Sequence, residues 1–127
     1  MNTYPAQAQS GRPLILCVDD NETQLRLLND VLVREGFQVL QAATPKEAVE
    51  MMMEAPVSLV IADHFLRGLT GTELALKLKK IKPTVPILLH SGAQPETMKN
   101  VDAFLNKGEP IAEFLRVVRD LVRRFSS

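Results

Sequence analysis

The chain has 127 residues, of which 46% are hydrophobic, and its fifteen basic and fifteen acidic residues give a net charge of zero. This length supports one hydrophobic core and is too short for two ordinary domains, so we expect a single domain. The charge balance argues against the strongly basic surface that is typical of nucleic-acid-binding proteins. The single cysteine, Cys17, excludes an internal disulfide framework and is expected to be a small buried apolar side chain.

The N-terminal residues 1–12 are rich in Gln, Ala, Ser, Gly and Pro, which predicts a flexible tail ahead of a folded domain over residues 13–127. This tail has neither the basic start nor the long apolar stretch of a signal peptide. No segment of the chain reaches the roughly 18 apolar residues that are needed to span a bilayer. We therefore expect a cytoplasmic protein that does not bind a membrane.

Apolar runs and helical patterns alternate along the folded domain. The run "LILCV" is short and continuously apolar, as expected for a strand that is covered on both faces. Gly36 marks the end of the first helical pattern, and Thr44 and Pro45 are the expected N-cap and first residue of the second. In chain order we predict a strand at 14–18, a helix at 21–36, a strand at 37–42, a helix at 44–55, a strand at 57–63, a helix at 70–82, a strand at 85–91, one or two helical turns within 92–100, a strand at 101–107 and a helix at 110–125.

This alternation predicts a doubly wound α/β fold. Parallel strands need crossover connections, and a helix after each strand supplies them on both faces of one open sheet. The pattern fits a five-stranded parallel sheet in the flavodoxin-like order 2-1-3-4-5, with a shortened fourth helix. In such sheets, ligands bind beyond the carboxyl ends of the strands, where the strand order reverses.

Polar side chains follow four of the predicted strands at this edge. They are Asp19 and Asp20 after the first strand, Asp63 after the third, Ser91 after the fourth and Lys107 after the fifth. Because the first and third strands are neighbours in this order, three carboxylates would share one cleft and need a compensating cation. Oxygen ligands with positions left for water or phosphate suit Mg²⁺. The alternative is that a carboxylate, or Asn21, merely caps the following helix without any metal.

In this order and spacing, the residues resemble the receiver domain of two-component response regulators, especially the small chemotaxis type. The resemblance covers about residues 13–125. It rests on "DD" after the first strand, "IAD" followed eight residues later by Gly71, "LLHSG" after the fourth strand and "FLNK" after the fifth. It implies a signalling domain that switches conformation in a phosphorelay, and not a turnover enzyme.

The resemblance also implies a role for each site residue. Asp63 would accept a phosphoryl group from a sensor histidine kinase or a phosphotransfer protein, and a downstream protein would read the result. Mg²⁺ would be held by Asp20, Asp63 and the main-chain carbonyl of Phe65, with Asp19 acting largely through water. Ser91 and Lys107 would bind the phosphoryl oxygens, and Phe104 would occupy the aromatic switch position.

The sequence departs from the family pattern at three places. Arg67 stands where the family usually has a proline, four residues after the expected phosphoacceptor. The family's lysine is usually followed directly by proline, whereas "KGEP" inserts two residues after Lys107. Fifteen residues separate Ser91 from Lys107, fewer than the family usually has, so we expect the intervening helix to be shortened and the usual output partner not to carry over.

Three other classes of protein remain as alternatives. A degenerate receiver would act by docking alone, and would be expected to lack acidic or lysine positions that this chain retains. A small Mg²⁺-dependent aspartyl phosphatase would place its nucleophile in an Asp-x-Asp pattern on the first strand and would usually carry a cap, for which this length leaves no room. A flavin carrier would need a phosphate-binding loop, where "DDNETQ" is acidic. We expect His64 to point away from the cleft, because successive strand residues face opposite sides, and His90 to be partly buried and partnered.

Overall fold

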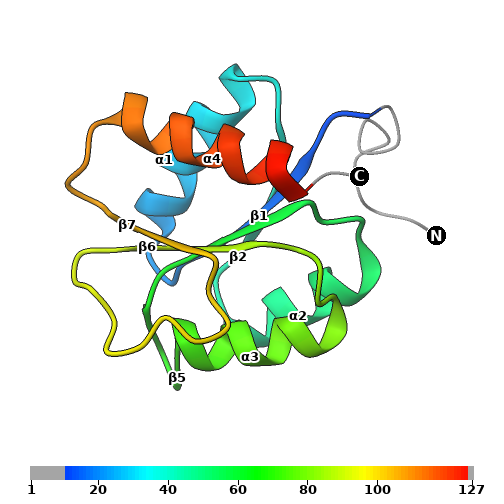
Figure 1. Cartoon of the computed structure of the whole chain (residues 1–127), viewed down its shortest axis with the longest axis vertical. Helices are drawn as coiled ribbons and strands as arrows, with labels where there is room; N and C mark the ends of the chain where they lie inside the picture. Colours follow the sequence, from blue (N-terminus) through cyan, green and yellow to red (C-terminus); the bar gives the residue numbers. More distant parts are fainter. Residues whose placement is uncertain (1–10, 126–127) are drawn as a thin grey trace.

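The structure is a computed structural model and describes residues 11–125. Its central sheet has five parallel strands in the order β2-β1-β3-β6-β7, which confirms the predicted order 2-1-3-4-5 (Figure 1). The strands are β1 (Leu14–Val18), β2 (Gln38–Ala42), β3 (Leu59–Ala62), β6 (Ile87–Ser91) and β7 (Ala103–Asn106). A separate two-stranded antiparallel hairpin, β4 (Phe65–Leu66) with β5 (Leu69–Thr70), follows β3.

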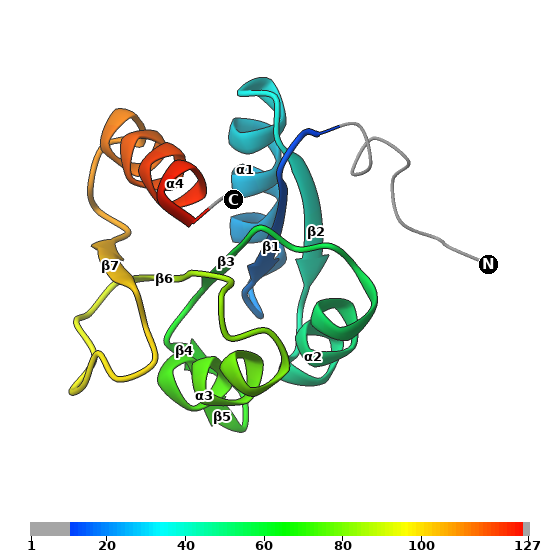
Figure 2. The same ribbon diagram turned by 45° about the vertical axis from the view of Figure 1, so that its right-hand side comes forward.

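Within residues 11–125, four helices cover the two faces of the sheet. They are α1 (Glu22–Arg34), α2 (Pro45–Glu54), α3 (Gly71–Ile81) and α4 (Ile111–Phe125). Helices α1 and α4 lie on one face and α2 and α3 on the other (Figures 1 and 2). The fold is therefore the doubly wound α/β arrangement that the alternation of strands and helices predicts.

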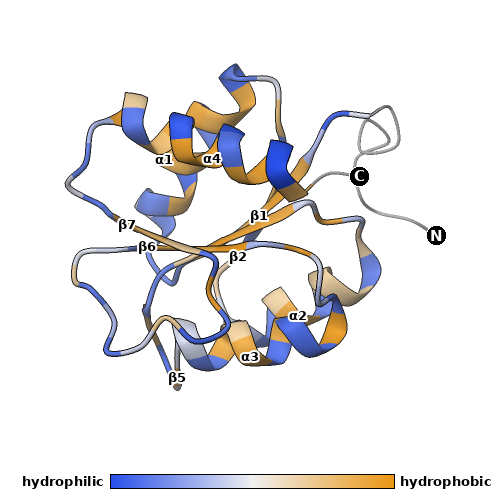
Figure 3. Cartoon of the chain, viewed as in Figure 1, coloured by the Kyte–Doolittle hydropathy of each residue, from blue (hydrophilic) through white to orange (hydrophobic). Residues whose placement is uncertain are grey.

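The apolar pattern of β1 explains why both faces are covered. Leu14, Leu16 and Val18 belong to the core cluster under α2 and α3, whereas Ile15 and Cys17 belong to the cluster under α1 and α4. Successive strand side chains alternate between faces, so a continuously apolar strand feeds two cores at once. Apolar residues accordingly dominate the strands, and the helices show their polar residues on one side (Figure 3). Cys17 is fully buried, as predicted.

Side-chain caps fix where the helices begin. Thr44 is the N-cap of α2 and accepts a hydrogen bond from the backbone of Glu47 at 3.1 Å, and Pro45 is the first helical residue, as predicted. Helix α3 begins with a capping box between Thr70 and Glu73.

The predicted short helix between β6 and β7 is wrong. Within the described residues, 92–102 form bends and turns with no helical segment. Helices of one or two turns are unstable unless packing supports them, and Pro95 disfavours a helical conformation at the residue before it. Two contacts of Asp102 tie this connection to the fold instead. Its Oδ2 forms an ion pair with Lys79 Nζ of α3 and accepts a hydrogen bond from the backbone N–H of Ile87, both at 2.8 Å.

Both ends of the chain extend past the described part. The predicted tail, residues 1–12, falls largely outside it, and the described Gly11 and Arg12 are exposed ahead of β1. Residues 126 and 127 also lie outside the described part. Among the helices that the structure describes, none combines the length and the apolar character that crossing a membrane requires.

Candidate functional site

Three carboxylates converge at the carboxyl ends of β1 and β3. These strands are hydrogen-bonded neighbours, with Val18 paired to Ala62, so the residues that follow them meet at one edge of the sheet. Asp19, Asp20 and Asp63 each offer a carboxylate oxygen within 4.8 Å of the others. Asp19 is buried, Asp63 is half-buried and Asp20 is exposed. The prediction that these three carboxylates lie close together is confirmed.

Two cations border the cluster. Lys107, which follows β7, places its Nζ 2.9 Å from Asp19 Oδ2 and 3.4 Å from Asp63 Oδ2. Arg67, from the β4–β5 hairpin, places its Nε 3.7 Å from Asp20 Oδ2. Three carboxylates against these two cations leave one net negative charge, so the cluster attracts a further cation.

Helix capping does not account for the carboxylates. The N-cap of α1 is Asn21, whose side chain accepts from the backbone N–H of Gln24 at 3.0 Å. Asp19 Oδ1 accepts from the backbone N–H of Asn21 at 2.9 Å, which orients its second oxygen toward Lys107. Asp20 lies beside this cap with its carboxylate turned to the cluster. An all-oxygen set with excess negative charge fits a hard divalent cation such as Mg²⁺.

Ser91 ends β6 with a hydroxyl that lacks a partner. The residue is completely buried, and its Oγ has no hydrogen-bond partner among the residues that the structure describes. Its backbone carbonyl accepts from the N–H of Lys107 at 2.9 Å, which fixes the ends of β6 and β7 to each other. A buried hydroxyl without a partner is costly in a folded protein, and such groups are often reserved for function.

Phe104 and Phe65, the two phenylalanines that are assigned roles from the sequence, differ in how far they are buried. Phe104 pairs with Leu89 in the β6–β7 ladder, is half-buried and packs against the core cluster under α2 and α3. Phe65 opens the hairpin with a 59% exposed side chain, and its backbone N–H makes a long 3.4 Å hydrogen bond to Asp63 Oδ1. The hairpin itself was missed by the sequence prediction, although Gly68, with φ of 79°, is a turn signal that favours it.

Gly71 is required by a close contact. It begins α3, and its N–H donates to the carbonyl of His64 at 2.7 Å. A Cβ at this position would lie 2.6 Å from the Asp63 carbonyl oxygen and 2.6 Å from Leu89 Cδ2. A larger residue would therefore displace the backbone of the expected phosphoacceptor, which explains the glycine eight residues after it.

The two histidines lie outside the carboxylate cluster. The His64 ring packs edge-on against Phe65, with 5.1 Å between centroids, and lines a hollow beside the start of α3. His90 is buried against Phe114, with 5.0 Å between ring centroids, and its Nδ1 has no hydrogen-bond partner among the described residues. Burial, together with the charge of Lys107, lowers the pKa of His90 to about 4. We predicted a partnered His90, and the structure gives it an apolar neighbour instead.

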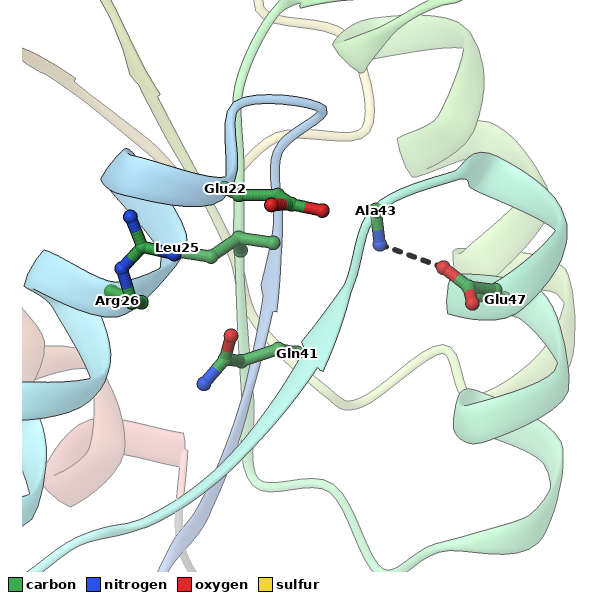
Figure 4. A pocket seen from close by; sticks show the side chains of 6 residues that line it. All are labelled: Glu22, Leu25, Arg26, Gln41, Ala43 and Glu47. Carbon is green, nitrogen blue, oxygen red and sulfur yellow. Dashed lines mark hydrogen bonds between the residues drawn. The ribbon is translucent and has the colours of Figure 1, made fainter.

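A second hollow at this edge of the sheet lies between α1 and the start of α2 (Figure 4). Glu22, Leu25, Arg26, Gln41, Ala43 and Glu47 line it. Glu47 is engaged in helix capping there, because its Oε1 accepts from the Ala43 N–H at 2.8 Å. The polar side chains that line this hollow do not form a carboxylate cluster like that of Asp19, Asp20 and Asp63. We therefore assign the functional site to the carboxylate cluster.

Comparison with known proteins identifies the family. Residues 15–114 match the family described as response regulator receiver domain, and the chain belongs to this family. The transcriptional regulatory protein SrrA of Staphylococcus aureus is 32% identical over 119 residues, which cover 89% of this chain and 49% of SrrA. The chain thus spans about half the length of the curated relatives it matches. A receiver domain is a signalling module rather than a turnover enzyme.

Solved structures agree with this assignment. A CheY-like receiver domain protein from Methanospirillum hungatei superposes with a TM-score of 0.83 at 24% identity, over 91% of this chain and 97% of that chain, which shows the fold. The response regulator TrrA from Thermotoga maritima, in complex with Mg²⁺-BeF, has a TM-score of 0.81 at 26% identity, over 86% of this chain and 98% of that chain. In this chain, the oxygens of Asp19, Asp20 and Asp63 lie close enough together to hold a metal ion.

Proposed function

We propose that this domain takes a phosphoryl group onto Asp63 from a histidine kinase or a phosphotransfer protein. The observation that carries the proposal is the convergence of three carboxylates with Lys107, whose Nζ lies 3.4 Å from Asp63 Oδ2. Asp19 is 2% exposed, too buried for a donor to approach, and Asp20 lies on the Arg67 side of the cluster. Asp63 combines partial exposure with the contact to Lys107, so it is the carboxylate best suited to attack.

The donor set fits Mg²⁺, and three groups would hold it. They are the carboxylates of Asp20 and Asp63 and the main-chain carbonyl of Phe65, with Asp19 acting through water. When bound, Mg²⁺ neutralises negative charge on a transferring phosphoryl group. The Mg²⁺-BeF complex of TrrA supports this proposal, because that relative binds the ion in a superposable fold.

Lys107 supplies a fixed positive charge next to the new bond. An oxygen of Asp63 forms a bond to phosphorus while the bond between phosphorus and the donor's histidine breaks. The Lys107 ammonium already contacts Asp63 Oδ2 and is only 28% exposed, so it can stabilise the phosphoryl oxygens with little rearrangement. Its second partner, Asp19, holds it in place at 2.9 Å.

Ser91 and Phe104 would convert phosphorylation into a change of surface. The Ser91 hydroxyl has no hydrogen-bond partner among residues 11–125, so the acceptor oxygens of an acyl phosphate would stabilise it in a new position. Phe104, half-buried in the neighbouring strand, could then fill the space that Ser91 vacates. A downstream protein that prefers one of the two packings would read the signal. Transfer of a phosphoryl group from a kinase and contact with a downstream protein favour a cytoplasmic location.

Intact-mass measurement tests the assignment. Acetyl phosphate with Mg²⁺ should add one phosphoryl mass to the wild type and none to Asp63→Asn, which keeps the shape of the side chain but removes its nucleophile. Asp30→Asn, which changes an exposed carboxylate on α1, should label like the wild type. Labelling that persists in Asp63→Asn would disprove the assignment. No labelling of the wild type would favour the degenerate receiver that signals by docking alone.

A further inference from the structure

Arg67 reaches the acidic cluster from an unusual element. Leu66 pairs with Leu69 in the β4–β5 hairpin, so Arg67 and Gly68 form its two-residue turn. Gly68 has a φ of 79°, a conformation that two-residue hairpin turns favour. The turn projects Arg67 toward the end of β1, where its Nε lies 3.7 Å from Asp20 Oδ2. A proline in place of Arg67 would supply no charge at this point.

The two cations of the site, Lys107 and Arg67, contact different carboxylates. Lys107 contacts Asp19 and Asp63, while Arg67 contacts Asp20. With both cations present the cluster carries one net negative charge, and without Arg67 it would carry two. Asp20 is also the exposed member of the three, so it is the carboxylate that an incoming cation meets first.

We propose that Arg67 is a resident counter-cation that competes with Mg²⁺ for Asp20 and so weakens metal binding by this site. This inference rests on the proposed function. The Arg67 side chain is 93% exposed and that of Asp20 is 31% exposed, so the guanidinium can leave Asp20 for water without burying an unpaired charge. It is therefore a displaceable competitor, and it raises the dissociation constant for Mg²⁺ without blocking the site.

The test measures Mg²⁺ dissociation constants by calorimetric titration of the unphosphorylated protein. Arg67→Gln should bind Mg²⁺ about two- to fivefold more tightly than the wild type, as expected for loss of one exposed ion pair. Arg67→Lys, which keeps the charge, should stay close to the wild type. The difference between Arg67→Gln and the wild type should shrink as salt is raised, because exposed charges are screened.

Arg119→Gln is the matched control. Arg119 forms an exposed ion pair with Glu35 at 2.9 Å, and the Gln variant loses the same net charge outside the site. Its Mg²⁺ affinity should equal that of the wild type. An Arg67→Gln variant that binds no more tightly than Arg119→Gln would overturn the inference and leave the proposed function standing. A wild type that binds no Mg²⁺, or binds it as tightly as Asp20→Asn does, would overturn both.

Discussion

At the scale of single residues, the surroundings of Asp63 bear on how long a phosphoryl group would last. In the family, the positions two residues after the phosphoacceptor and two after the hydroxyl residue border the path of the attacking water. Here they are Phe65 and Ala93, neither of which can orient a water by a hydrogen bond. Phe65 is 59% exposed, so its ring covers the site incompletely, and the expected slow hydrolysis follows from the apolar character of Phe65 and Ala93. General-base assistance, typically worth about 10²- to 10⁴-fold, should be missing.

We therefore predict a slowly self-hydrolysing phosphoprotein. The double variant Phe65→Asn with Ala93→Glu should lose its phosphoryl group at least several-fold faster than the wild type, because it gains groups that can hold and deprotonate a water. The half-life is measured by intact mass after the phosphodonor is removed. Phe65→Leu keeps an apolar side chain and should match the wild type. An unchanged half-life in the double variant would contradict the prediction.

At the scale of elements, the connection from β6 to β7 depends on Asp102 rather than on a helix. Its carboxylate forms an ion pair with Lys79 Nζ and accepts a hydrogen bond from the Ile87 N–H, and the side chains of Asp102 and Lys79 are 23% and 18% exposed. Lys79 also donates to the carbonyl of Val85 at 2.8 Å, so one ion pair joins α3 to the starts of β6 and β7. Hydrogen bonds to charged groups that are shielded from water contribute more than exposed ion pairs do.

Asp102→Ala should consequently destabilise the domain. Removing the carboxylate leaves the Ile87 N–H and the Lys79 ammonium without this acceptor, which should cost about 1–3 kcal/mol in the free energy of unfolding. Urea denaturation followed by circular dichroism measures this cost. Asp120→Ala is the control, since Asp120 pairs on α4 with Arg124, whose side chain is 60% exposed, and its loss should change stability by less than about 1 kcal/mol. Equal effects of the two substitutions would show that Asp102 is an ordinary surface residue.

The elements also show where prediction from sequence succeeds and where it fails. Strands β1 and β3 could be predicted because a strand with two buried faces is continuously apolar, as both of them are. The hairpin could not be predicted from periodicity, because each of its strands has two residues. The segment 92–100 lacks a helix because so short a helix depends on packing, which local sequence does not reveal.

The same reasoning applies to the site. Asp19, Asp20 and Asp63 could be brought together from the sequence, because the strand order makes β1 and β3 neighbours. Lys107 follows β7, at the edge of the sheet, and its long side chain reaches Asp19 and Asp63 from there. The contact between Arg67 and Asp20 could not, because it depends on the hairpin that projects Arg67. The burial of His90 against Phe114 likewise requires the packing of α4 on the sheet, which the pattern of β6 does not specify.

At the scale of the whole molecule, His90 makes folding sensitive to acid. It is 7% exposed, it packs against Phe114, and its Nδ1 has no hydrogen-bond partner among the described residues. Its pKa is lowered to about 4, mainly by burial and in part by the charge of Lys107, while Asp63 opposes the shift. His90, Lys107 and Glu109 line one hollow between α1 and α4. The native fold therefore holds a neutral imidazole where the unfolded chain, with a pKa of about 6.5, would take up a proton.

The folded-state pKa of His90 is lower than its unfolded value, so the unfolded chain binds more protons at pH values between the two pKa values. The free energy of unfolding therefore decreases as the pH is lowered through this window. From about pH 6.5 down to about pH 4 the contribution of His90 should decline by about 3 kcal/mol, with no further loss below that window. His90→Leu and His90→Gln should both lose this part of the pH dependence, although they differ in polarity and in absolute stability. The measurement is the free energy of unfolding from urea denaturation at several pH values, with each variant subtracted from the wild type so that the titration of carboxylates cancels. A difference curve that stays flat between pH 6.5 and pH 4 would contradict the prediction, since it would mean that His90 takes up its proton equally readily in the folded and unfolded chains.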